Sequence, residues 1–236
     1  MRDLQGQAES NQVLSRSGRD THTAAGVGLR IATEADAPFI GEILAHAGDP
    51  IGALAFGPQA ATAIETLTRS DLHQPGVVTH VATAEGRVVG VAVVIDAHRH
   101  LGDLDLRGTL GRPRALWASL VVRVAAQAGL APGEAYLESL AVSPAWQRQG
   151  VARSLLTSAV GEAVRRGSVE LAFWVAARNA AGLSFFEGFG CEPSRERRWI
   201  VLPGPPWAFR MLRFRIGLEA AEGDEPSARA LPRANG

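Results

Sequence analysis

The stretch that most constrains the fold of this chain runs from residue 135 to residue 154, where the sequence reads AYLESLAVSPAWQRQGVARS. Its first part, residues 136–142, is apolar apart from Glu138 and Ser139, which predicts a buried strand. Pro144 ends this strand, because proline has no backbone N–H to donate to a sheet. A helix is predicted after the turn, since apolar residues recur at helical spacing: Val151, Leu155, Ala159 and Val160.

The turn between this strand and this helix has the composition of an anion site. Gly150 and Ala152 leave little side chain near the backbone, so the first amide N–H groups of the helix are open to a ligand. These amides lie at the positive end of the helix dipole, and two arginines can add charge. The residues predicted to surround a pyrophosphate are Gln147, Arg148, Gln149, Gly150, Val151, Ala152 and Arg153.

The turn could instead have a purely structural role, because Gly150 and Ala152 could simply let a helix pack closely against a strand. A nucleotide P-loop is disfavoured, because no Gly-Lys-Ser/Thr follows the glycine. A dinucleotide-binding fingerprint is disfavoured too, because its three spaced glycines are missing.

The run QRQGVA at 147–152 resembles the Gln/Arg-x-x-Gly-x-Gly/Ala loop of the GCN5-related N-acetyltransferase (GNAT) family, which holds the pyrophosphate of acetyl-coenzyme A. The surrounding sequence is also similar in order and spacing: LAV-SP before the loop, an apolar strand at 171–175, Asn179, and FFEGFG at 185–190. The resemblance covers residues 30–216, more weakly in the first half. It implies an α/β fold with a mixed, mostly antiparallel sheet of about seven strands and helices on both faces.

The resemblance also implies how the coenzyme is held. In the family the fourth and fifth strands splay apart and the pantetheine arm lies between them, so backbone groups of Leu140, Ala141 and Val142 are expected to pair with its amides. The Val142 N–H, or a neighbour, is expected to polarise the thioester carbonyl. Asn179 matches an asparagine near the arm, although asparagine is also a good helix N-cap.

The implied chemistry is direct attack of a neutral amine on the thioester of acetyl-coenzyme A. Glu138 is the candidate general base, because a carboxylate in an apolar strand should be partly desolvated, which raises its pKa. It could instead hold an arginine or bind the acceptor. Many relatives have a tyrosine, which acts as the general acid, at the position of Phe186 in this chain. The resemblance also implies that Phe186 contacts the coenzyme. Ser184 could replace the tyrosine as proton donor, or water could protonate the departing thiolate. Alternatively, acetyl transfer could be slow or absent.

The rest of the chain divides into a polar tail at 1–26, an N-acetyltransferase domain at 27–218 and a polar tail at 219–236, both tails predicted to be disordered. In the domain, Thr33 and Asp36 have capping-box spacing at the start of a helix, and 51–58 is expected to be a loop before a second helix at 59–72. Runs at 77–84 and 87–95 predict a hairpin. A second hairpin is predicted from strands at 199–202 and 212–216.

Residues 97–133 are longer than the usual family link and are treated as an insertion. A loop is expected at 97–114, followed by a helix at 114–128 whose shared face carries Leu116, Leu120, Val121 and Val124. The insertion could cover the acceptor side of the enzyme, contribute to a homodimer, or simply bury its own apolar stripe.

Composition excludes several classes of protein. The formal net charge is zero, which argues against nucleic-acid binding, and the chain has no lysine. The start lacks the apolar core of a signal peptide, no apolar run could span a membrane, and a single cysteine, Cys191, suits a reducing cytoplasm. His98 and His100 lie near acidic residues, but a solvated loop is preferred to a metal site.

The sequence indicates two candidate functions. The first is an enzyme, an acetyl-coenzyme A-dependent N-acetyltransferase without a metal, whose acceptor is a small amine or a peptide amine. The second is a catalytically weak acyl-coenzyme A-binding module that acts as a sensor or an interaction partner.

Overall fold

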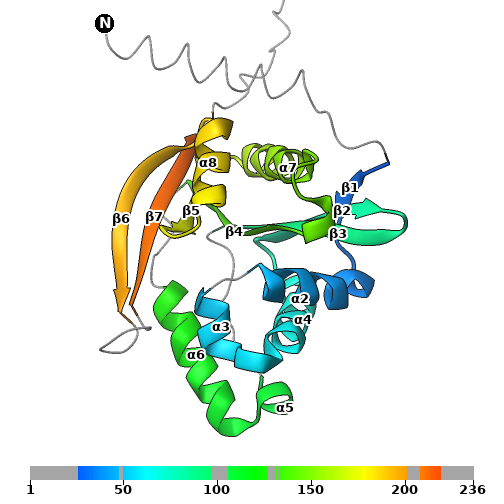
Figure 1. Cartoon of the computed structure of the whole chain (residues 1–236), viewed down its shortest axis with the longest axis vertical. Coiled ribbons are helices and arrows are strands. Elements are labelled where there is room, and N and C mark those ends of the chain that lie inside the picture. Colours follow the sequence, from blue (N-terminus) through cyan, green and yellow to red (C-terminus); the bar gives the residue numbers. More distant parts are fainter. Residues whose placement is uncertain are drawn as a thin grey trace, which may run out of the picture.

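The computed structural model describes residues 26–47, 50–96, 106–126, 131, 133–200 and 208–218. Within these residues the strands form one seven-stranded sheet in the order β1-β2-β3-β4-β5-β7-β6 (Figure 1). Every neighbouring pair is antiparallel except β4 and β5. The predicted mixed, mostly antiparallel sheet of about seven strands is therefore confirmed.

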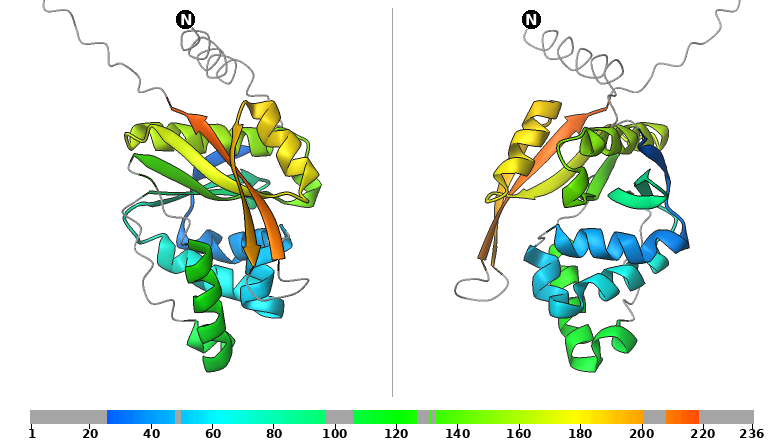
Figure 2. Two further views of the ribbon diagram at one scale, coloured as in Figure 1. Left: turned by 90° about the vertical axis from the view of Figure 1, so that its left-hand side faces the viewer. Right: turned by 45° about the vertical axis from the view of Figure 1, so that its right-hand side comes forward.

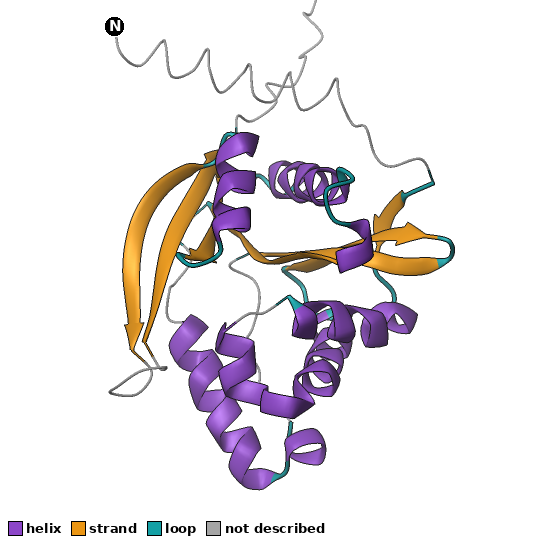
Figure 3. Ribbon diagram, viewed as in Figure 1, coloured by secondary structure: helices purple, strands orange, loops and turns teal. Residues whose placement is uncertain are grey.

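Helices cover both faces of the sheet, as predicted (Figures 1 and 3). On one face lie α7 (Val151–Arg165) and α8 (Ala180–Phe189). The other face carries α2 (Ala37–His46), while α3 (Pro50–Phe56), α4 (Ala60–Asp71), α5 (Arg107–Leu110) and α6 (Arg112–Ala126) extend the layer away from the sheet. None of the helices that the structure describes is long and apolar enough to cross a bilayer.

The strands match the sequence prediction closely in the first half. β1 (Gly28–Ile31) is the edge strand, and β2 (Val77–Ala84) and β3 (Arg87–Ile95) form the predicted hairpin. β4 (Glu134–Val142) and β5 (Glu170–Ala176) run parallel, with α7 as the crossover between them. The apolar stripe of α7 is buried as expected, with Val151, Leu155 and Ala159 each at most 1% exposed.

The predicted loop at 51–58 is wrong, because α3 and a short 3-10 helix at Gly57–Gln59 occupy this stretch. Pro50 is the first residue of α3, a position where its missing N–H removes no helical hydrogen bond. Phe56 is 5% exposed and packs with Leu106 and Val121 in a small core of α3, α4, α5 and α6. Tertiary burial therefore outweighs the glycine and proline signals that favoured a loop.

The insertion departs from its prediction in two ways. Residues 107–110 are helical, and the following helix begins at Arg112. The predicted apolar face is wrong in part: Val121 is 2% exposed as expected, but Leu116 and Leu120 are 75% and 54% exposed. Ala115 and Ala118, which are at most 3% exposed, share the buried face instead. Small residues occupy the buried face of α6, where helices pack closely.

The last hairpin consists of β6 (Glu192–Ile200) and β7 (Ala208–Gly217). Its first strand begins at residue 192, well before the predicted 199. The polar run EPSRERR has no apolar alternation from which a strand could be predicted. Charged residues and a proline are nevertheless typical of an edge strand, and β6 is at the edge of the sheet. Residues 201–202 of the predicted strand, the tails 1–25 and 219–236, and His98 and His100 lie outside the described residues.

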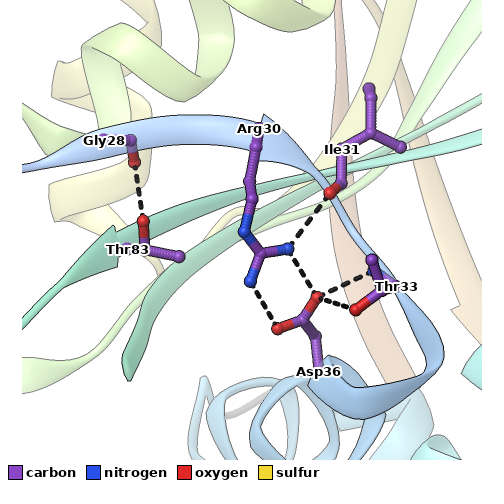
Figure 4. A network of polar contacts seen from close by, with 6 residues as sticks. All are labelled: Gly28, Arg30, Ile31, Thr33, Asp36 and Thr83. Carbon is purple, nitrogen blue, oxygen red and sulfur yellow. Dashed lines mark hydrogen bonds and ion pairs between the residues drawn. The ribbon is translucent and has the colours of Figure 1, made fainter. Parts of the chain in front are cut away.

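A polar network fixes the start of α2 beneath the edge strand (Figure 4). Asp36 accepts hydrogen bonds from the Thr33 N–H at 2.7 Å and the Thr33 hydroxyl at 2.9 Å, which confirms the predicted capping box. Arg30 donates to both carboxylate oxygens of Asp36, at 2.6 and 2.7 Å. These donors lower the pKa of Asp36 to about 2, with the Arg30 hydrogen bond as the largest cause.

The Asp36 network should make stability depend on pH. Because the folded-state pKa of about 2 is below the unfolded value, the contribution of Asp36 is present above pH ~4 and is lost as the pH falls through ~2. Replacing Asp36 with Asn is expected to lower the free energy of unfolding by about 2 kcal/mol at pH 7. Urea denaturation at pH 7 and pH 2.5 should show this difference shrinking in acid. The exposed control Glu85→Gln should change little at either pH, and an acid-independent loss for Asp36→Asn would contradict the assignment.

Candidate functional site

The central strand β4 contains a bulge at Glu138. Val93 of β3 is paired with Ser139, but the next residue of β3, Val94, is paired with Leu137, so Glu138 is the extra residue on β4. A bulge bends a strand locally and re-aims its side chains. The sequence predicted a carboxylate here but did not reveal this irregularity.

Beyond the bulge, β4 and β5 separate. Their parallel pairing covers only three residues of each strand, from Glu134 opposite Glu170 to Tyr136 opposite Ala172. Apart from Glu138, residues 137–142 of β4 remain paired with β3 on one side, and residues 173–176 of β5 remain paired with β7. Among the described residues, no strand is thus paired with the β5-facing edge of β4 along Leu140, Ala141 and Val142, although the Val142 carbonyl accepts a hydrogen bond from the Gln147 side chain. This is the divergence expected from the resemblance.

The Glu138 side chain is exposed. The expectation that it lies in an apolar, partly desolvated environment is therefore not met, because the bulge directs it out of the regular alternation of the strand. Glu138 lies where β4 and β5 begin to separate, and its role as a general base stays a prediction.

The turn after β4 presents backbone amides at the start of α7. Gly150 is the N-cap residue with φ of 82°, and Arg148 has φ of 61°. The first hydrogen bond of the helix runs from the Ser154 N–H to the Gly150 carbonyl at 3.0 Å, so the amides of 151–153 precede it. A residue other than glycine is strained at the Gly150 conformation. The sequence thus places glycine at the helix entry, where the chain must turn left-handed.

Glutamine side chains hold the turn in place. Gln147 Nε2 donates to the Val142 carbonyl at 3.1 Å, and Gln149 Nε2 donates to the Ala145 carbonyl at 2.9 Å. The two predicted site residues therefore fasten the turn to the end of β4 and to the 3-10 helix Pro144–Trp146. Their side chains shape the amide cluster in addition to any contact with a ligand.

The two arginines of the turn have different surroundings. Arg153 donates to the Gly188 carbonyl at 3.4 Å, and its guanidinium lies 5.3 Å from the centre of the Phe189 ring. These contacts join the start of α7 to the end of α8. Arg148 is exposed at the left-handed position of the turn, so its charge is available to a ligand at the surface.

Asn179 acts as the N-cap of α8. Its Oδ1 accepts a hydrogen bond from the Gly182 N–H at 2.9 Å, which confirms the capping role allowed by the sequence. The side chain is exposed beside the end of β5, and contact with a coenzyme arm stays a prediction.

Phe186 and Ser184 lie on different sides of α8. Phe186 is 8% exposed, with ring centres 4.2 Å from Phe173 and 6.3 Å from Phe214, so it belongs to the aromatic core. Ser184 is exposed. Phe186 cannot donate a proton, and Ser184 is the hydroxyl that this part of α8 offers.

A cleft of about 280 Å³ opens between the end of α2 and the end of β4. Glu42 and His46 line it from α2, and Gln147 lines it from the turn. The remaining lining residues are Ile43, Ala47, Val142, Ser143 and Pro144. Glu42 and His46 are not among the site residues predicted from the sequence. The only signal was their spacing of four residues, which places both on one face of the helix.

Cys191 is unsuited to nucleophilic chemistry. It is 4% exposed, and burial raises the pKa of its thiol to about 12. The thiol therefore stays protonated near neutral pH. Among the residues that the structure describes, no three His, Cys, Asp or Glu side chains gather as metal ligands would.

Diverging central strands followed by a cluster of amides at a helix start define a class of coenzyme-binding α/β proteins. The model of the acetyltransferase (GNAT) family matches residues 53–191, which is more than half of the chain. The chain therefore belongs to the GNAT family, as the sequence resemblance implied.

Curated relatives match a shorter part of the chain. The [ribosomal protein bS18]-alanine N-acetyltransferase of Escherichia coli strain K12 is 40% identical over 65 residues, which are 28% of this chain and 44% of the relative. The corresponding protein of Salmonella typhimurium strain LT2 is 40% identical over the same length. The match thus spans less than half of the length of these relatives.

Solved structures are similar to nearly the whole fold. The E. coli ribosomal-protein-S18-alanine N-acetyltransferase aligns with a TM-score of 0.55 and 18% identity over 84% of this chain and 97% of that chain. A Salmonella typhimurium protein solved with its cofactor acetyl-CoA gives 0.56 and 19% over 86% and 99%. At these identities the likeness establishes the fold.

Proposed function

We propose that this protein is an N-acetyltransferase that moves the acetyl group of acetyl-coenzyme A to a primary amine by direct attack within a ternary complex. The observation that supports it most is the combination of a β4 edge that no described strand pairs along Leu140–Val142 with the amides of residues 151–153, which precede the first hydrogen bond of α7. A pantetheine arm carries amides that such an edge can pair, and a pyrophosphate suits a helix N-terminus. The residues present therefore fit the coenzyme.

The roles of the site residues follow from their positions. Backbone groups of Leu140, Ala141 and Val142 would hold the arm. The pyrophosphate would be bound by the amides and side chains of the turn, which comprises Gln147, Arg148, Gln149, Gly150, Val151, Ala152 and Arg153. Asn179 would flank the arm from the start of α8, and Phe186 would support it from the core.

The chemical step needs a proton acceptor and a proton donor. Glu138, at the bulge, would accept a proton from the amine, and Ser184 or water would protonate the departing thiolate. A thiol has a free pKa of about 8.5, so the thiolate is a tolerable leaving group without a strong acid. No covalent enzyme intermediate is needed, since amine and thioester can meet in one complex.

The acceptor is proposed to be a small amine or the amine of a peptide, and the place of action the cytoplasm. The relatives act on an alanine of a ribosomal protein, which supports including peptide N-termini among the candidates. We propose no role for nucleic acid or a membrane. We also propose that the protein can form a homodimer, because Leu116 and Leu120 of α6 are exposed.

A coenzyme-binding module without turnover is the second candidate function. It is favoured by one observation, the core position of Phe186 where many relatives have a proton-donating tyrosine. Such a module would bind acetyl-coenzyme A through the same turn and act as a sensor or partner.

Release of free thiol with a panel of amines separates the two functions. The panel should contain small primary amines and a peptide with an N-terminal alanine. Buried Cys191 should add little background in the native protein. Thiol release that depends on an amine supports the enzyme, whereas tight coenzyme binding without release supports the module.

The role of Glu138 is tested by replacing it with Gln. If Glu138 accepts the proton, turnover should fall by roughly 100-fold while coenzyme affinity stays within twofold, because a general base contributes about 10²–10⁴-fold to a rate. The pH–rate profile should change its shape as well. Glu85→Gln, in the exposed turn between β2 and β3, is the control. An unaltered pH–rate profile for Glu138→Gln would remove the residue from the mechanism.

A further inference from the structure

The Val142 carbonyl, at the end of β4, points to the side on which β5 diverges. The N–H of the same peptide unit belongs to Ser143 and donates to the Val89 carbonyl of β3 at 2.8 Å. Because the C=O and the N–H of a trans peptide point in opposite directions, the Val142 carbonyl faces away from β3. It is therefore an acceptor on the β5-facing edge of β4, where the proposed function places the pantetheine arm.

The Gln147 side chain already binds this acceptor. Its Nε2 donates to the Val142 carbonyl at 3.1 Å. A carbonyl oxygen can only accept, so the side-chain NH₂ group of Gln147 is the donor. This group is an amide N–H, the same kind of donor that a pantetheine arm carries. The turn thus makes, with its own side chain, the contact that the arm is proposed to make.

The neighbouring glutamine of the turn leaves the edge of β4 alone. Gln149 Nε2 donates to the Ala145 carbonyl at 2.9 Å, and Ala145 lies in the 3-10 helix Pro144–Trp146. Both glutamines are exposed, and each makes one hydrogen bond to a backbone carbonyl. The two side chains therefore differ in one respect that matters here, because only the bond of Gln147 ends on β4.

Gln147 also lines the cleft beside α2, which gives its side chain a place to go. The cleft has a volume of about 280 Å³, and Ser143 and Glu42 line it as well. A serine hydroxyl and a carboxylate both accept hydrogen bonds. A Gln147 amide that leaves the Val142 carbonyl can therefore find a new acceptor or water, so its departure leaves no buried donor without a partner.

We propose that Gln147 is a positioning residue whose side-chain amide holds the Val142 carbonyl in the free protein and gives it up to an amide N–H of the pantetheine arm. This inference rests on the proposed function and adds a competition between the coenzyme and the protein's own side chain. One N–H···O hydrogen bond is exchanged for another, and no covalent bond changes. The arm displaces Gln147, whereas the diphosphate alone does not.

Gln147→Ala tests the exchange with two ligands, acetyl-coenzyme A and ADP, which carries a diphosphate but no pantetheine arm. In the variant the arm no longer has to displace a donor of the protein. We expect the ratio of the Kd for ADP to the Kd for acetyl-coenzyme A, measured by calorimetry, to rise about fivefold, the factor that one hydrogen bond of typical net strength supplies. Any loosening of the turn weakens both ligands and cancels in the ratio.

Two further variants complete the test. Gln149→Ala is the matched control, since it removes a hydrogen bond within the turn but none to β4, and its ratio should equal that of wild type. Gln147→Met keeps a side chain of similar length without an N–H donor, so its ratio should rise as in Gln147→Ala. An unchanged or lower ratio in both Gln147 variants would overturn the proposal, because the carbonyl would then accept both donors at once or not serve the arm.

NMR of the side-chain NH₂ groups gives a readout in the wild-type protein. The Gln147 resonances, identified by their loss in Gln147→Ala, should shift strongly with acetyl-coenzyme A and little with ADP. Equal shifts with the two ligands would contradict the exchange. If wild type bound no acetyl-coenzyme A, the proposed function would fail and the exchange with it, whereas coenzyme binding with an unchanged ratio in the variants rejects the exchange alone.

Discussion

Gly150→Glu is expected to abolish coenzyme binding, with a loss of affinity of at least 100-fold. Gly150 occupies the N-cap of α7 with φ of 82°, a conformation that costs an L-residue about 1–2 kcal/mol. The glutamate would also place a negative charge among the amides that are proposed to bind the pyrophosphate, at the positive end of the helix dipole. Strain and repulsion between like charges therefore act in the same direction. Calorimetric titration with acetyl-coenzyme A measures the loss.

The control for this variant is Gly86→Glu. Gly86 also has a positive φ, 75°, in the turn between β2 and β3, and a Cβ added there meets nothing within 4 Å. The control introduces the same charge and a similar backbone strain away from the site, so its coenzyme affinity should match wild type. Gly150→Ala, which adds strain without charge, should lie between the two. Full affinity in Gly150→Glu would contradict the assignment of the turn.

Phe173→Ala is expected to cause the largest loss of stability, about 4 kcal/mol. Phe173 is 2% exposed on β5, and its ring centre lies 4.2 Å from that of Phe186 of α8 and 5.8 Å from that of Phe214 of β7. Truncation removes these contacts and leaves a cavity that the sheet and α8 can fill only in part. The predicted loss is a large share of the roughly 5–15 kcal/mol typical of a folded domain.

Urea denaturation of the variant and a matched control checks the prediction for Phe173. The control is Phe39→Ala on α2, since Phe39 is 43% exposed and should cost less than about 1 kcal/mol. A lower midpoint with an unchanged slope would show that stability itself has changed. Similar costs for the two phenylalanines would mean that the aromatic cluster does not hold α8 to the sheet.

The sequence predicted best those elements whose pattern is locally complete. The stripe of α7 at Val151, Leu155 and Ala159 repeats at helical spacing, and the β2–β3 hairpin has two apolar runs around a two-residue turn. Both were confirmed, because each buries its apolar residues in the way its own period dictates. The sequence likewise predicted the helix start at Val151 after Gly150, while the binding role of this loop stays a prediction.

The sequence failed where tertiary contacts decide. The bulge at Glu138 depends on how β3 is paired with β4, which no local pattern encodes. α3 was missed because Pro50 and the nearby glycines suggested a loop, although the small core around Phe56 stabilises a helix. On α6 the larger residues, Leu116 and Leu120, point outward because close helix packing selects alanine.

The candidate site also combines residues that a local pattern predicts with residues that only tertiary contacts bring in. Residues 147–153 are contiguous, so a motif can identify them. Glu42 and His46 reach the end of β4 only because α2 crosses the sheet from the edge strand toward it (Figure 2). Their sequence distance from the loop, about a hundred residues, hides this relation.

The binding of acetyl-coenzyme A at the turn after β4 is the claim on which every proposed role depends. A crystal soaked with acetyl-coenzyme A tests it most directly. We expect the diphosphate against the amides of residues 148–153, with the pantetheine arm between β4 and β5. Coenzyme bound anywhere else, or not at all at concentrations that saturate a working acetyltransferase, would contradict the account.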